Sequence, residues 1–129
     1  MREFPYLKTL MKETEMIAVI FEVLPFPARK QEYLDIAASL APQLKEMDGF
    51  ISIERFQSLS DAHKILSLSF WRDEKAVAGW RNIEAHRGAQ SKGREDVFQD
   101  YRIRIAGVIR DYGLNEREQA PKDSRYQHG

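Results

Sequence analysis

The sequence predicts an α+β domain with the ferredoxin-like order β-α-β-β-α-β, in which a four-stranded antiparallel sheet carries two helices on one face. Three observations favour this class. Four short segments have the composition or the period of strands, and two longer segments between them repeat apolar residues with the period of a helix. A short polar loop joins the second and third strand segments as a hairpin.

The first predicted strand is MIAVIFEV, which begins at Met16. It has apolar residues on both faces, so we expect it to be covered on both sides. Pro25 and Pro27 end it, because proline cannot donate a hydrogen bond to a sheet. Since the two helices cover only one face, the other face needs a partner, and the sequence predicts a two-fold homodimer with facing sheets.

The first helix is predicted over residues 29–47, where apolar residues form a single stripe. Pro42 falls inside the stripe and should kink the helix or restart its last turn. Gly49 follows as a stop signal, because glycine adopts the left-handed conformation that other residues avoid. The second strand is predicted over residues 50–59, and the polar residues 60–63 turn the chain into the third strand.

The segment from Lys64 to Gln90 combines a strand, a corner and a helix. In the strand, residues 65–71, large apolar residues alternate with serines. Asp73 is predicted to cap the helix by accepting hydrogen bonds from its first amides. Both tryptophans lie here, as does the one histidine that falls inside a predicted helix or strand. Any small-molecule site is therefore expected in this segment.

The last strand is predicted over residues 101–112, after a polar segment, 91–100, that has room for one more helical turn. From Leu114 onwards the periodicity ends, so this part is expected to be flexible or to be ordered only against a partner. The predicted division of the chain is an N-terminal extension (residues 1–15), a domain (residues 16–113) and a C-terminal tail (residues 114–129).

Composition narrows the class of protein. The 129 residues carry 20 basic and 20 acidic side chains, so charge gives no reason to expect a nucleic acid or an anionic membrane as partner. The absence of cysteine excludes disulfides, thiolate nucleophiles and Cys-ligated metals within this sequence. No apolar run approaches the roughly 20 residues of a membrane-spanning helix, and the first residues lack the apolar block of a signal peptide. We expect a cytoplasmic protein without membrane contact.

Three segments and the order of the elements resemble the antibiotic biosynthesis monooxygenase domain, a family of dimeric α+β barrels. The segments are MIAVIFEV, DGFISIERFQS and LSLSFWRDEKAVAGWRN with the following IEAHR, and the resemblance covers about residues 16–113. It implies the barrel fold and the homodimer. The family includes cofactor-free oxygenases of aromatic polyketides, haem-degrading enzymes and proteins of unknown activity, so the fold alone does not decide the reaction.

The residues at the positions of the haem ligands in the haem-degrading members of this family disfavour haem degradation. In the haem-degrading relatives a Trp on the second helix is followed about three turns later by the His that binds iron, and an Asn lies on the first strand. Trp80 matches that Trp, but Gln90 stands at the ligand position and the first strand contains no Asn. Since an amide is a poor iron ligand, no haem is expected, and no other cofactor or metal is expected either.

His86 is the candidate catalytic base. Helical spacing puts it at the edge of the buried stripe, above Gly79, whose missing side chain leaves space for a ligand. A half-buried histidine with a pKa near 6.5 can act as a general base at neutral pH. The structural alternative is an edge histidine bonded to a carbonyl group or to water.

Trp80, Trp71 and Phe21 are the candidate walls of a substrate pocket beside Gly79, although large aromatic residues at these spacings also serve as ordinary core. Arg87 shares the face of Trp80. It either extends over the apolar stripe, pairs with Glu84, or faces an anionic substrate.

Three functions are compatible with these residues. The first is a cofactor-independent monooxygenase that holds a small aromatic or enolisable substrate in a dry pocket beside a base. The second is a related barrel enzyme without oxygen chemistry, an isomerase or a decarboxylase. The third is a non-catalytic module that binds a small molecule.

Overall fold

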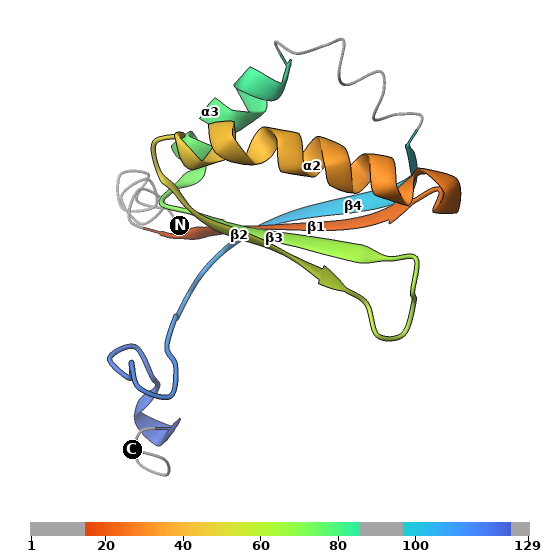
Figure 1. The fold of residues 1–129 in the computed structure, drawn as a ribbon. Helices are drawn as coiled ribbons and strands as arrows, with labels where there is room; N and C mark the ends of the chain where they lie inside the picture. Colours follow the sequence, from red (N-terminus) through yellow and green to blue (C-terminus); the bar gives the residue numbers. More distant parts are fainter. Residues whose placement is uncertain (1–14, 86–96, 125–129) are drawn as a thin grey trace, which may run out of the picture.

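The computed structural model describes residues 15–85 and 97–124. Within them the chain forms the predicted ferredoxin-like α+β fold, with a four-stranded antiparallel sheet in the order β2-β3-β1-β4 and both long helices above one face (Figure 1). In chain order the elements are β1 (Ile17–Pro25), the 3-10 helix η1 (Pro27–Arg29), α2 (Lys30–Lys45), β2 (Phe50–Gln57), β3 (Ile65–Trp71), α3 (Glu74–Ala85) and β4 (Phe98–Gly107).

The corner between β3 and α3 is fixed as the sequence predicts. The carboxylate of Asp73 accepts a hydrogen bond of 2.9 Å from the backbone amide of Ala76, which caps the first turn of α3. The guanidinium of Arg72 donates to Asp73 at 3.1 Å and to both carboxylate oxygens of Asp48, at 3.1 and 3.0 Å. The corner is thereby tied to the loop that precedes β2.

These contacts change the acidity of both carboxyl groups. The hydrogen bonds from Arg72, and then its charge, hold the pKa of Asp48 below its ordinary value. The pKa of Asp73 is lowered first by the backbone amide of Ala76 and then by Arg72. Both carboxyl groups are therefore charged at neutral pH, and each supports the corner in that form.

Gly49 meets the same corner from the other side. It has a positive φ of 85°, and a Cβ atom built on it would lie 2.5 Å from the Cβ of Ala76. Its carbonyl oxygen also accepts a hydrogen bond of 2.7 Å from the amide of Arg72. Only glycine allows both the backbone conformation and this close approach.

The structure corrects three of the predicted boundaries. Residues 98–100 belong to β4, although they fall in the polar segment 91–100 that precedes the predicted strand, and the strand ends at Gly107 instead of at residue 112. The second strand ends at Gln57 instead of at residue 59. Pro42 lies inside α2, which continues to Lys45; the tertiary packing of this helix outweighs the one hydrogen bond that proline cannot donate.

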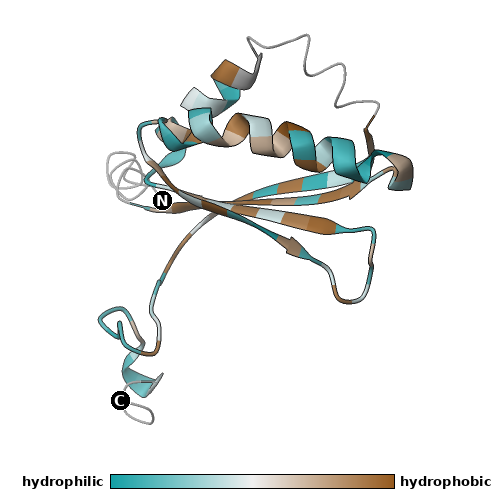
Figure 2. Ribbon diagram, in the orientation of Figure 1, coloured by the Kyte–Doolittle hydropathy of each residue, from teal (hydrophilic) through white to brown (hydrophobic). Residues whose placement is uncertain are grey.

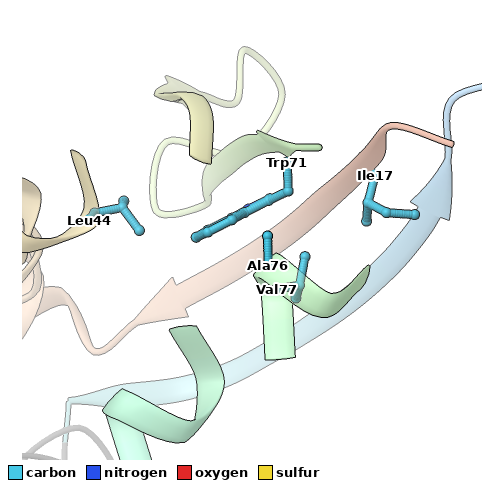
Figure 3. Packing of buried hydrophobic residues seen from close by; sticks show 5 residues of the cluster. All are labelled: Ile17, Leu44, Trp71, Ala76 and Val77. Atoms are coloured by element: carbon cyan, nitrogen blue, oxygen red, sulfur yellow. The ribbon is translucent and has the colours of Figure 1, made fainter. Parts of the chain in front are cut away.

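The core above the sheet is divided into two clusters. The first, which we call the Trp71 cluster, gathers where α2 and α3 meet the sheet (Figure 3). Its buried members are Ile17, Leu44, Trp71, Ala76 and Val77. The second, the Val23 cluster, lies toward the other end of β1 and consists of Val23, Tyr33, Ile65 and Val97. Because Leu44, Ala76 and Tyr33 belong to helices, these clusters identify the helix-covered face of each strand.

The opposite face of the sheet has no helix over it in the described parts of the chain (Figure 1). Strand alternation assigns this open face mainly apolar residues, with one ion pair of 3.2 Å between Arg104 and Glu22. Its apolar members are Ala18, Ile20, Leu24, Phe56, Leu66, Leu68, Phe70 and Ala106.

After β4 the chain leaves the sheet on the side away from the helices (Figure 1). We call residues 108–124 the C-terminal arm. Its turns are held by its own contacts, including a hydrogen bond of 2.9 Å from the amide of Asp111 to the side chain of Gln119 and the stacking of Arg117 over the ring of Tyr112. Ile109 and Leu114 remain exposed on it.

Candidate functional site

Between the two core clusters lies a strip that we call the central band. It consists of two rows of residues that run across the helix-covered face of the sheet, one residue from each strand. The first row is Arg55, Ser67, Phe21 and Ile103. The second row is Ile53, Ser69, Val19 and Ile105. The band lies between the two clusters: Val19 and Ile53 pack against the Trp71 cluster, and Phe21 packs against the Val23 cluster.

The middle of the band is small and polar. Ser67 and Ser69 are both buried, each with 7% of its surface exposed. The hydroxyl oxygen of Ser69 accepts a hydrogen bond of 3.0 Å from the indole nitrogen of Trp71, and its own hydrogen is left to donate. Two serines at buried positions place hydroxyl groups, and little volume, between the apolar clusters.

The β4 side of the band is apolar and open. Hydrophobic and hydrophilic segments alternate along β4 (Figure 2). In the sequence Tyr101, Ile103 and Ile105 alternate with arginines, and they expose 56%, 51% and 46% of their surfaces although they point to the helix-covered face. Phe21 continues this surface on β1. An exposed row of large apolar side chains beside a buried core is a typical place for an apolar ligand.

One end of that row is closed by aromatic rings. The ring centroids of Phe21 and Tyr101 are 5.6 Å apart, and those of Phe21 and Phe98 are 5.8 Å apart. Phe98 in turn meets Tyr33 of α2 at 5.7 Å. These edge and tilted contacts are the favourable arrangements of aromatic pairs, and they give the central band an aromatic wall.

The predicted pocket residues are divided between the two clusters. Trp71 is a core residue of the Trp71 cluster, and Trp80 packs against that cluster from α3. A Cβ atom on Gly79 would lie 3.5 Å from the terminal methyl carbon of Met47, an ordinary contact distance. Phe21 packs instead against the Val23 cluster. His86 and Arg87 lie outside the described residues.

Sequence reasoning did not select the other members of the central band. Ser67, Ser69 and Arg55 are visible in the sequence only as parts of alternating strands, and Ile103 and Ile105 only as the apolar face of the last strand. The signal that was present is the pair of serines on the buried face of a strand that is otherwise apolar there. The strand register, which brings the five residues together, cannot be read from the sequence.

In residues 15–85 and 97–124, no group of three or more His, Asp or Glu side chains is placed to hold a metal ion. In the same residues, no helix is both long enough and apolar enough to cross a membrane.

A four-stranded ferredoxin-like sheet with an apolar, partly aromatic band under its helices defines a small α+β domain suited to a small ligand. The family model of the antibiotic biosynthesis monooxygenases matches residues 16–92, and the chain belongs to that family.

Relatives support this assignment. The chain is 50% identical over 101 residues to a protein of Pyricularia oryzae named jasmonate monooxygenase ABM, a match that covers 78% of this chain and 47% of the relative. The chain thus spans about half the length of that relative. It is 28% identical over 78 residues to the uncharacterised protein YqjZ of Bacillus subtilis, covering 60% of this chain and 67% of that protein.

Solved structures share the fold. The crystal structure of PA3566 from Pseudomonas aeruginosa superposes with a TM-score of 0.65 at 20% identity, covering 75% of this chain and 97% of the other. At this level of identity the likeness concerns the arrangement of helices and strands alone.

Proposed function

We propose that this protein is a cofactor-independent monooxygenase that acts on a small aromatic or enolisable substrate bound at the central band. The observation that carries the proposal is the band itself, in which two buried hydroxyl groups lie between apolar clusters and beside an aromatic wall. Family membership supports the reaction class.

The relative's name adds support for the substrate class. Its printed name refers to jasmonate, which is an enolisable ketone with a carboxylate side chain. An enolisable ketone can lose a proton to a base and become electron-rich enough to reduce O₂. We therefore include jasmonate among the first substrates to test.

The proposed reaction balances without an external reductant when a CH₂ group becomes a carbonyl group. The substrate loses a proton to give a phenolate or an enolate, which passes one electron to O₂. The resulting substrate radical and superoxide combine to a peroxide, which loses water. One oxygen atom of O₂ enters the product, the other leaves in water, and all four electrons come from the substrate.

The chain's own groups serve three tasks in this reaction. The exposed row on β4 and the ring of Phe21 hold the ring of the substrate and exclude water. The hydroxyl hydrogen of Ser69 is available to bind a developing oxyanion. His86 is the proposed base, because its sequence spacing from Gly79 and Trp80 predicts a place at the edge of the apolar stripe. It must come within about 3 Å of the acidic proton, directly or through one water molecule.

The test is oxygen incorporation by the purified protein. Chelator-treated protein is supplied with ¹⁸O₂ and a panel of phenols and enolisable ketones, including jasmonate, and the products are analysed by mass spectrometry. One ¹⁸O atom per product molecule is expected, and His86→Ala should lower turnover by roughly 10²–10⁴-fold. Turnover without oxygen uptake would indicate the isomerase or decarboxylase, and tight binding without turnover would indicate the binding module.

The functional unit that we propose is a homodimer formed through the open face. That face carries eight apolar residues on four strands, and an apolar face without a helix over it is a typical interface between proteins. The C-terminal arm projects on the same side (Figure 1), and its exposed Ile109 and Leu114 are placed to contact a second copy.

A further inference from the structure

Arg55 has a buried nitrogen without a partner. It lies on the helix-covered face of β2, in the first row of the central band, opposite Ser67. Its Nε atom is buried and makes no hydrogen bond to any residue that the structure describes. Within the described residues, Arg55 also takes part in none of the ion pairs, which join Arg29 to Glu32, Arg72 to Asp48 and Asp73, and Arg104 to Glu22.

An unpaired, buried donor on a permanent cation is unfavourable. Buried polar groups in native proteins are nearly always hydrogen-bonded, and the exceptions call for an explanation. Arginine carries five N–H donors in a planar fork and stays charged at any ordinary pH. The site around Arg55 therefore has a hydrogen-bond donor without an acceptor and a positive charge without a negative partner among the described residues.

The nearest polar side chain on the same face of β2 does not compensate this charge. The amide nitrogen of Gln57 lies 2.8 to 3.4 Å from four loop carbonyl oxygens, those of Ser58, Asp61, Ala62 and Lys64. Its amide oxygen accepts a hydrogen bond of 3.1 Å from the ammonium group of Lys30. Both ends of Gln57 are engaged, and Lys30 brings a second positive charge to this edge of the sheet.

We propose that Arg55 binds the carboxylate of an acidic substrate whose ring lies on the central band. This inference rests on the proposed function, because it assigns the substrate class for the same site. A carboxylate matches the guanidinium fork with two parallel hydrogen bonds and supplies the missing negative charge. Arg55 is a residue for binding and specificity, and it does not take part in the proton transfer.

The register limits the size of that substrate. β2 and β1 are separated only by β3, and neighbouring strands lie about 4.8 Å apart, so Arg55 and Phe21 start roughly 10 Å apart across the sheet. The small Ser67 stands between them. A single ring beside Phe21, joined by a short chain to a carboxylate at Arg55, matches this span in length. The substrate class is thus a monocarboxylate with one small ring.

The experiment compares acids with their methyl esters, which have nearly the same shape and no charge. Binding of jasmonate, 4-hydroxyphenylacetate and cyclopentylacetate, and of the three methyl esters, is measured by calorimetry on the full chain. The wild-type protein should bind at least one acid about 10-fold or more tightly than its ester. Arg55→Gln should weaken that acid by roughly 10- to 100-fold and change the ester by less than about twofold.

Two more variants separate charge from geometry. Arg55→Lys keeps the charge without the fork and should retain only part of the preference for the acid. Arg81→Gln removes an exposed arginine from α3 and should leave both affinities unchanged. Because the buried Nε atom of Arg55 has no hydrogen-bond partner among the described residues, the midpoint of thermal unfolding of Arg55→Gln should equal or exceed that of the wild type.

Three results would overturn the inference: equal binding of acids and esters by the wild type, undiminished acid binding by Arg55→Gln, or a preference for acids that Arg81→Gln removes equally. If Arg55→Gln fails to fold, Arg55 has a structural partner and the inference is wrong as well. The ¹⁸O₂ incorporation assay tests the monooxygenase proposal independently of the carboxylate site. Absence of ¹⁸O incorporation together with an Arg55-dependent preference for acids would refute the monooxygenase proposal and leave the carboxylate site standing.

Discussion

The indole N–H of Trp71 donates a hydrogen bond of 3.0 Å to the hydroxyl oxygen of Ser69, two residues earlier on the same face of β3. This bond joins the largest side chain of one core cluster to the central band. Both groups are buried, so each satisfies a polar atom that would otherwise be without a partner.

Ser69→Ala should therefore lower the free energy of unfolding by about 1–3 kcal/mol, because the indole N–H loses its acceptor in a buried position. Urea unfolding followed by tryptophan fluorescence measures this change. Ser67→Ala is the matched control, since Ser67 is equally buried on the same strand but does not bind the indole. Equal losses in the two variants would show that the bond to Trp71 contributes nothing.

Gly49→Ala should destabilise the protein by about 1–3 kcal/mol, because alanine at φ 85° is strained and its Cβ would meet that of Ala76 at 2.5 Å. The midpoint of thermal unfolding is the measurement. Gly113→Ala serves as control, since nothing lies within 4 Å of the Cβ position there. An unchanged midpoint in Gly49→Ala would mean that the corner can move away at no cost.

The two aspartates at the corner between β3 and α3 should make the stability of the fold depend on pH. The pKa values of Asp48 and Asp73 are lowered in the folded protein. Their contribution is thus fully present above the ordinary aspartate value of 3.8 and is lost as the pH falls through the lower folded values. Wild-type stability should fall more steeply below about pH 4 than that of the double variant Asp48→Asn, Asp73→Asn.

Asparagine suits this test because it still caps a helix but does not titrate in this range. Urea midpoints are measured in small pH steps from 6 downwards. Asp111→Asn, at an exposed position of the arm, is the control and should follow the wild type. Parallel pH profiles for the wild type and the double variant would contradict the assignment.

Leu68→Asp should convert the proposed dimer into a monomer. Leu68 lies on the open face of the inner strand β3, opposite Ile20 of β1 and Glu54 of β2. A carboxylate there would have to be buried without a partner in a face-to-face dimer. Light scattering at micromolar concentration measures the mass. Ala38→Asp, on the exposed side of α2, should remain dimeric, and a wild-type protein that is itself monomeric would refute the barrel.

Removal of the C-terminal arm tests its part in the assembly. A chain that ends after Gly107 keeps all four strands and should dissociate at a concentration at least about 10-fold higher than the full chain. Analytical ultracentrifugation over a dilution series gives both constants. Identical constants would show that the arm makes no contact with the second copy.

The order of the elements could be predicted because local patterns determine it. The alternation of serine with large apolar residues predicts β3 at residues 65–71, the span that the structure shows. The helix cap by Asp73 could also be predicted, because the capping residue and the amide that it accepts from lie within one turn of each other. These features depend on residues that are close together in the sequence.

The start of β4 could not be predicted in this way. Gln99 and Asp100 are polar, yet they lie in a strand because β4 pairs with β1, Asp100 opposite Leu24. The hydrogen bonds between the backbones of β4 and β1 hold these residues in the strand, although their side chains do not favour one. The candidate site could not be predicted for the same reason. Arg55 and Ile103 lie in one row only because of the registers in which β2 pairs with β3, β3 with β1, and β1 with β4.

The place of β1 in the sheet has a consequence for synthesis on the ribosome. β1 emerges first of the strands but pairs on one side with β3 and on the other with β4, the last strand of the sheet. Until residues 98–107 have left the exit tunnel, one edge of this apolar strand has no partner. A nascent chain stalled before that point therefore presents an unpaired strand edge to neighbouring nascent chains, and the sheet is complete only once β4 has been synthesised and has paired with β1.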